Sequence, residues 1–227
     1  MGDNQPLHKM ELAFFGTITA SVSHELNNVL SIINEYCGLL DDLIAANDKG
    51  LPLENDRIKK IALNIASQIK REQDIIKLLN RFSHRVDNLH VQFNLNELVM
   101  DISRLSQRLA SLKKIDLGID IPKEPIVLTN NPFSVQHIIF LCLKLAMDCS
   151  FTTDFINVIL KTNESRAVIK IESPTVAINE ETEKMINLIS DLSKKLSGDS
   201  EIFILDNNRQ VQQISIPLFL QNGLTDH

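Results

Sequence analysis

A histidine near the N-terminus lies among residues that are suited to phosphoryl transfer. His24 is followed directly by Glu25, and Asn28 stands four residues after the histidine. A neutral imidazole nitrogen is nucleophilic, and a neighbouring acceptor such as Glu25 can orient the ring through its other nitrogen. The amide of Asn28 could hydrogen-bond to phosphoryl oxygens or to a water where negative charge develops. These residue types are compatible with phosphoryl transfer, but taken alone they favour an ordinary solvated surface histidine.

Two long amphipathic helices are predicted to position these residues. Apolar residues recur at three- and four-residue intervals from Phe15 to Leu43, and a second such run extends from Ile58 to Phe82. Gly50 and Pro52 separate the two runs, so we expect a helical hairpin.

The hairpin geometry predicts the surroundings of His24 and an oligomeric state. If Val22 and Glu25 lie in the apolar stripe, His24 falls on the outer face beside Ser21, Asn28 and Ser31. Two such helices cannot bury both apolar stripes against each other alone. We therefore expect residues 1–88 to form a homodimer held by a four-helix bundle.

The pattern changes after residue 88 to short strands mixed with helices. This predicts a second domain over residues 89–227, an α+β sandwich with one mostly antiparallel sheet and helices on one face. The expected strands are 91–93, 115–119, 125–128, 155–160, 167–171, 201–205 and 212–217, and the expected helices are 95–112, 135–149 and 180–196.

The segment Ser21 to Leu30 resembles the H-box of histidine kinases, a His-Glu-Leu-Asn-Asn-Pro-Leu type of motif, with Val29 where proline is usual. In that family the histidine is the phosphoacceptor, the adjacent glutamate acts as a base, and the asparagine supports kinase or phosphatase chemistry. The resemblance implies these roles for His24, Glu25 and Asn28.

The resemblance extends over nearly the whole chain. Residues 78–83 resemble the end of the second dimerisation helix, and residues 93–98 resemble the start of the ATP-binding domain. Residues 129–138 resemble the approach to the helix that holds nucleotide-binding asparagines in that family. The resemblance implies an H-box hairpin followed by an ATP-binding-like α/β domain.

The chain departs from this family at the nucleotide-binding positions. Leu141 and Leu145 stand where asparagines reach phosphate and Mg²⁺, and Ser173, Thr175 and Ala177 stand where an adenine-binding aspartate and two glycines are usual. The Gly-rich lid is also missing, and phosphate loops need glycine for close backbone approach. We therefore expect a degenerate ATP-binding domain without a cofactor, any Mg²⁺ being supplied by the partner.

The sequence favours a histidine phosphotransferase-like role in two-component signalling. In this hypothesis His24 relays phosphate to or from the aspartate of a response-regulator receiver domain. The receiver would dock along the first helix at Asn27, Ser31, Asn34 and Glu35. Three alternatives stay open: a catalytically silent dimeric regulator of a kinase or response regulator, a receiver phosphatase that uses Glu25 and Asn28, and a kinase with unusual nucleotide contacts.

Composition limits the other partners. Lys and Arg number 23 against 29 Asp and Glu, a net charge of −6, so no basic surface for nucleic acid is expected. No apolar run approaches the ~20 residues of a membrane span, and we expect a cytoplasmic protein without membrane contact. We expect no metal site at His84 and His90. The three cysteines are expected to be buried free thiols: Cys37, Cys142 and Cys149.

Overall fold

The structure is a computed structural model of residues 1–227. It describes the backbone of all residues except 1–4, 88, 151–153, 175–178, 206–208 and 219–227. The chain divides into two compact units, Met1–Arg81 and Phe82–His227.

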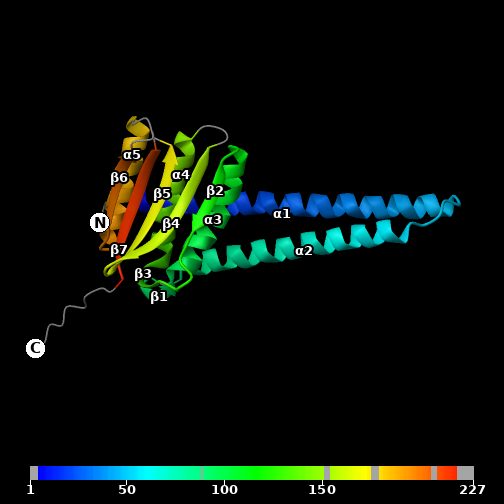
Figure 1. The fold of residues 1–227 in the computed structure, drawn as a ribbon, viewed down its shortest axis with the longest axis horizontal. Helices are drawn as coiled ribbons and strands as arrows, with labels where there is room; N and C mark the ends of the chain where they lie inside the picture. The colour runs from blue at the N-terminus through cyan, green and yellow to red at the C-terminus, as the bar shows by residue number, and fades with distance from the viewer. Residues whose placement is uncertain (1–4, 88, 151–153, 175–178, 206–208, 219–227) are drawn as a thin grey trace, which may run out of the picture. The chain divides into compact units, whose positions relative to one another are not determined.

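The first unit is an antiparallel helical hairpin (Figure 1). Helix α1 spans Gln5–Asp48 and helix α2 spans Asn55–His84, whose last turn belongs to the second unit. Gly50 has a φ of +88°, a left-handed conformation that suits glycine, and its backbone N–H donates to the carbonyl of Asn47. This cap ends α1 and turns the chain toward α2, which confirms the predicted helical hairpin.

The described residues of the second unit form two sheets rather than one. Strands β2 (Asp116–Asp120), β4 (Phe155–Asn163), β5 (Arg166–Pro174), β7 (Arg209–Pro217) and β6 (Asp199–Leu205) form a five-stranded sheet in that order. Only the β2–β4 pair among these is parallel. Strands β1 (Val91–Asn94) and β3 (Val127–Asn130) pair separately as an antiparallel ribbon. The prediction of a single sheet was therefore wrong, while its mostly antiparallel character is confirmed.

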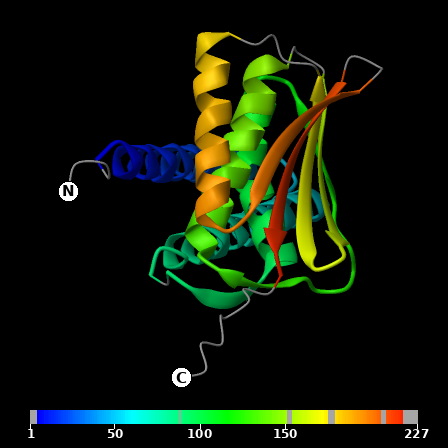
Figure 2. The same cartoon turned by 90° about the vertical axis from the view of Figure 1, so that its left-hand side faces the viewer.

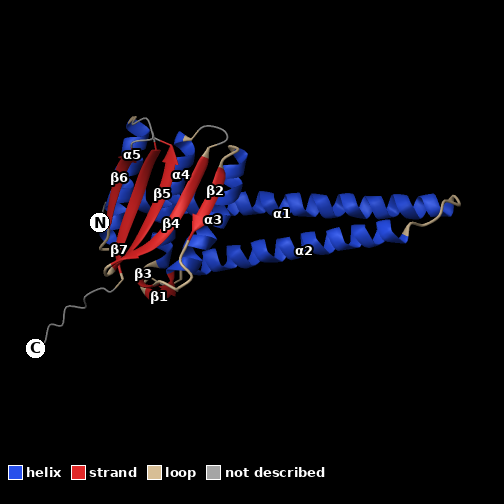
Figure 3. Ribbon diagram, in the orientation of Figure 1, coloured by secondary structure: helices blue, strands red, loops and turns tan. Residues whose placement is uncertain are grey.

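Three helices cover one face of the large sheet (Figures 2 and 3). They are α3 (Leu95–Leu112), α4 (Pro132–Cys149) and α5 (Glu180–Lys195). An asparagine caps the N-terminus of each helix by accepting a backbone N–H bond, at Asn94, Asn131 and Asn179. These caps satisfy backbone donors that a helix start otherwise leaves without a partner, so local residues define where the helical layer begins.

The core of this unit lies between the helices and the sheet. Helix α4 is apolar on nearly every side, as expected for a helix at the centre of a layer. It is long and apolar enough to cross a membrane, but most of it is buried inside the domain, as in the core helix of a globular protein. The sheet contributes alternate residues to the same core, all of them buried: Ile156, Val158, Leu160, Ile169, Ile171, Ile214 and Ile216.

The cysteines only partly match the prediction. Cys142 is buried, Cys149 is half-buried and Cys37 is exposed, and all three are free. Burial raises the pKa of the Cys142 thiol well above its usual range, so this thiol stays protonated. The prediction of burial was wrong for Cys37, because it lies on an exposed side of α1 together with Gly38 and Leu39.

Candidate functional site

The imidazole of His24 lies on an exposed face of α1. His24, Asn27 and Asn28 are exposed, whereas Val22 and Val29 on the opposite side of the helix are buried. Ser21 is also buried, so the prediction that it lies on the exposed side with His24 was wrong. Helical periodicity continues the exposed side through three further exposed residues, Ser31, Asn34 and Glu35. We call the six exposed residues the polar face of α1: His24, Asn27, Asn28, Ser31, Asn34 and Glu35.

One hydroxyl of the polar face is already engaged. The Ser31 Oγ donates to the backbone carbonyl oxygen of Asn27 at 2.9 Å, a bond from one helical turn to the previous turn. The side-chain amides of Asn27, Asn28 and Asn34 stand on the surface. The polar face therefore offers an imidazole and several amides to an approaching surface.

Glu25 points away from this face and toward the second helix. Its carboxylate Oε1 accepts a hydrogen bond from Nη2 of Arg71 on α2, and the two residues form an ion pair. The Glu25 side chain is 22% exposed and the Arg71 side chain is 55% exposed. This pair links α1 to α2 directly beside His24.

Sequence reasoning missed Arg71, although a signal was present. The apolar repeat of α2 is interrupted between Ile65 and Ile75, where Gln68 and Glu72 occupy half-buried positions of the stripe. The Gln68 Oε1 is buried without a hydrogen-bond partner among the described residues. A polar interruption of an apolar stripe often marks a position where two helices exchange polar contacts. It could have pointed to a partner for Glu25.

The positions where the family resemblance implies lost nucleotide contacts are buried. Leu141 and Leu145 lie one turn apart on α4 with exposed fractions of 8% and 1%, and Ser173 at the end of β5 is fully buried. Leucine side chains offer no donor to phosphate and no ligand atom to Mg²⁺. Thr175 and Ala177 lie outside the described residues.

Neighbouring side chains occupy the space around Ser173. Gln210 on β7 donates through Nε2 to the Ser173 Oγ at 3.2 Å, and both side chains are buried. Two positions along the same strand, the Gln212 Nε2 donates to the carbonyl oxygen of Cys142 on α4 at 3.2 Å. The Ser173 hydroxyl and the Gln212 amide nitrogen thus both have hydrogen-bond partners within this unit.

A separate group of polar residues fixes the segment that follows α2. The Arg85 Nη2 lies 2.6 Å from the Asp101 Oδ2 on α3, and the Arg85 Nη1 donates to the Gln136 Oε1 on α4 at 3.3 Å. The Arg85 and Asp101 side chains are only 15% and 4% exposed. This buried ion pair anchors residue 85 to the helical layer of the α/β unit, and the sequence did not indicate it.

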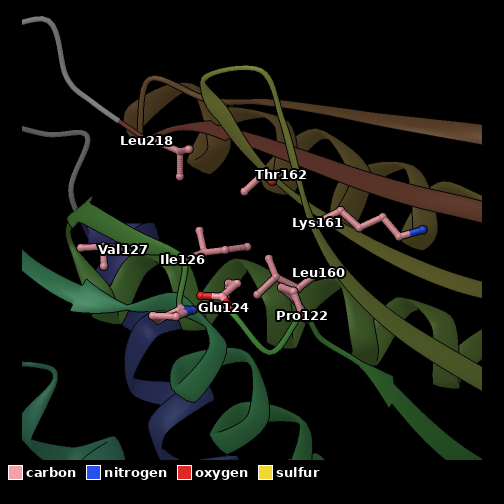
Figure 4. A pocket seen from close by; sticks show the side chains of 9 residues that line it. Pro122, Glu124, Ile126, Val127, Leu160, Lys161, Thr162 and Leu218 are labelled. Carbon is pink, nitrogen blue, oxygen red and sulfur yellow. The ribbon is translucent and has the colours of Figure 1, made fainter.

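The remaining candidates for a site among the described residues are metal-ligand groups, further histidine pairs and cavities. No group of three or more His, Cys, Asp or Glu residues suited to a metal ion occurs in the described parts of the chain. His84 is exposed and its Nδ1 lies 3.0 Å from the Asp87 Oδ2. An open cavity of about 550 Å³ lies beside β3 and β4 and is lined by Glu124, Lys161 and mostly apolar residues (Figure 4). None of the predicted site residues lines it.

Solved structures share the fold of this chain. A histidine kinase ThkA in complex with the response regulator TrrA is 18% identical, with a TM-score of 0.51, and the match covers 96% of this chain and 66% of that one. The histidine kinase AdeS of Acinetobacter baumannii is 13% identical, with a TM-score of 0.50 and coverage of 87% and 98%. No family model matches the chain. The chain therefore has a histidine kinase-like fold, with an N-terminal helical region and an ATP-binding-type α/β domain.

Proposed function

We propose that this protein is a two-component phosphotransfer protein that relays phosphate through His24 to or from the aspartate of a receiver domain. The observation that carries the proposal is the polar face of α1. It presents an exposed imidazole beside Asn28, within a segment that resembles the H-box.

The transfer step needs little more than an accessible ring nitrogen. A ring nitrogen of His24 attacks the phosphorus of an aspartyl phosphate, the bond between phosphorus and the aspartate oxygen breaks, and the aspartate leaves as a carboxylate. The exposure of His24 permits this approach. The amide of Asn28, one turn away, can donate to the phosphoryl oxygens as charge shifts in the transition state.

The α/β domain acts in this proposal without ATP. A kinase of this fold would hold nucleotide and Mg²⁺ with polar groups, but Leu141, Leu145 and Ser173 are buried, and Gln210 hydrogen-bonds to Ser173. In this proposal these side chains leave phosphate and Mg²⁺ without the polar groups that would hold them. The domain then serves as a packing or docking module.

A receiver domain is the partner that this chemistry requires. The related fold of ThkA has been solved with a response regulator bound, which is a precedent for such a complex. Asn27, Ser31, Asn34 and Glu35 lie on the same exposed side of α1 as His24. A receiver that contacts these residues would bring its phosphoaspartate to the imidazole.

The hairpin is proposed to act as a homodimer. Large apolar side chains remain exposed along both helices of one copy, and association in a four-helix bundle would remove them from water. Examples on the two helices are Leu30 at 46%, Ile44 at 55%, Leu63 at 63%, Ile69 at 43% and Ile76 at 42%.

The test incubates the full chain with each phosphorylated receiver domain of its source organism. We expect one receiver to transfer label to the protein as an acid-labile, base-stable phosphohistidine. The His24→Ala variant should take no label, and the His84→Ala variant, which removes another exposed histidine, should behave like the wild type.

Two other results would assign a different function. If a receiver binds and responds identically with His24→Ala, the protein is a silent regulator. If the receiver loses phosphate to water without any label on His24, and Glu25→Ala or Asn28→Ala abolishes that loss, the protein is a receiver phosphatase.

A further inference from the structure

Arg71 contacts the candidate site through Glu25, and no motif in the sequence assigns it a role. We propose that Arg71 is a positioning residue for the phosphoacceptor His24. Arg71 holds the Glu25 carboxylate toward α2 and offsets the negative charge of that carboxylate when a phosphoryl donor approaches. The inference rests on the proposed function and deepens it.

The ion pair joins two positions 46 residues apart in the chain, at the level of the phosphoacceptor. Because the Arg71 side chain is 55% exposed, water and salt screen the pair, and such pairs add little to stability. A purely structural role therefore explains the pair poorly. Its place beside His24 suggests that it acts on the electrostatics of the reaction.

The negative charge of the phosphoryl donor explains why the Glu25 carboxylate needs a cationic partner. A phosphoryl group carries about −1.5 to −2 charges at neutral pH, so a carboxylate that is adjacent to the phosphoacceptor repels it. The guanidinium of Arg71 is always protonated and pairs with that carboxylate. The carboxylate beside the phosphoacceptor is then a compensated charge, which repels the donor less than an isolated one would.

Arg71 also fixes the direction of the carboxylate. A glutamate on a helix surface can adopt several rotamers, but the bond from Arg71 Nη2 to Glu25 Oε1 holds the group toward α2. The approach to His24 from the polar face then stays open. Arg71 touches neither the imidazole nor the donor in this account, so it acts only through Glu25.

The experiment uses potassium phosphoramidate, a small anionic donor that needs no receiver. A ring nitrogen of His24 attacks phosphorus, the P–N bond of the donor breaks, and ammonia leaves as the new N–P bond forms. The labelling rate of His24 is measured in the full chain at low ionic strength. We expect Arg71→Gln to lower the rate roughly three- to tenfold, because the Glu25 carboxylate then repels the anionic donor by about 1 kcal/mol.

Three further variants isolate the mechanism. Arg71→Lys keeps the charge and should restore most of the rate. Lys70→Gln removes the same charge from the next residue of α2, which does not face Glu25 in the ion pair, and should leave the rate within about twofold of the wild type. In a Glu25→Gln background, Arg71→Gln should cause no further loss, because no carboxylate remains to be offset.

High salt gives an independent readout. Because the effect is electrostatic, the deficit of Arg71→Gln should shrink as ionic strength rises. The inference is overturned if Arg71→Gln labels as fast as the wild type, if Lys70→Gln is equally slow, or if the full deficit persists in the Glu25→Gln background.

The same experiment separates this inference from the proposed function. If wild-type His24 takes phosphate from neither phosphoramidate nor any receiver, the proposed function fails and the role of Arg71 fails with it. If His24 is labelled but Arg71→Gln has no effect, only the role of Arg71 fails.

Discussion

Replacing Arg85 by methionine should destabilise the α/β unit more than removing a charged side chain from the surface of that unit does. The Arg85 guanidinium is paired with the Asp101 carboxylate at 2.6 Å, with side chains that are 15% and 4% exposed. Breaking a buried pair by removing one partner costs about 3–5 kcal/mol, because a charge stays buried. The small exposure of Arg85 admits some water, so we expect the lower end, about 3 kcal/mol in the free energy of unfolding.

The assay is thermal unfolding of the full chain, followed by calorimetry and circular dichroism. For a unit of this size, about 3 kcal/mol corresponds to a fall of roughly 6–12 °C in Tm. The control Lys184→Met breaks an ion pair whose side chains are 73% and 84% exposed, and should cost less than about 0.5 kcal/mol.

A double variant tests the cause. Arg85→Met combined with Asp101→Leu removes both charges and should recover at least half of the lost stability. If Arg85→Met lowers Tm no more than Lys184→Met does, the ion pair does not hold the segment after α2, and the reasoning is refuted.

Three further predictions follow from the structure. Burial lowers the pKa of His137 to about 4, below the 6.5 expected when it is unfolded, so the unfolded state binds the extra proton. The contribution of His137 to the free energy of unfolding should be fully present above pH 6.5 and should fall by up to about 3 kcal/mol toward pH 4. In chemical denaturation, the free energy of unfolding of His137→Gln should depend less on pH than that of the wild type. The Ser103 and Ser106 hydroxyls are buried without a partner among the described residues. Replacing either serine by alanine should therefore raise the free energy of unfolding by up to ~1 kcal/mol, measured by urea denaturation. A loss of stability would contradict this prediction. Light scattering should give twice the monomer mass for the wild type, and Leu63→Glu with Ile69→Glu should yield monomer; a monomeric wild type at micromolar concentration would contradict the four-helix bundle.

Much of the fold could be predicted because local signals and tertiary structure agree. Helix α3 spans Leu95–Leu112, the range that the apolar period predicted, and the side chain of Asn94 caps its start. The start of α1 at Gln5 was missed, since the apolar repeat becomes regular only near Phe15 and an exposed residue such as Leu12 does not extend it.

Long-range pairing was harder to predict. Strand β1 was expected in the main sheet, but Val91 pairs with Asn130 in a separate ribbon, and a short strand carries no local mark of its partner. The Arg71–Glu25 and Arg85–Asp101 pairs join residues far apart in the chain or on different elements, so their geometry depends on how helices pack. The exposure of His24 could be predicted because it needs only the helical period.

The most direct test of the account is to locate the phosphoryl group after the protein meets a phosphorylated receiver. The transfer mixture is digested at alkaline pH, which preserves phosphohistidine, and the peptides are sequenced by mass spectrometry. We expect one added phosphoryl group on the peptide that contains His24, and none anywhere in the His24→Ala variant. A phosphoryl group on a different residue, or full transfer that survives His24→Ala, would contradict it.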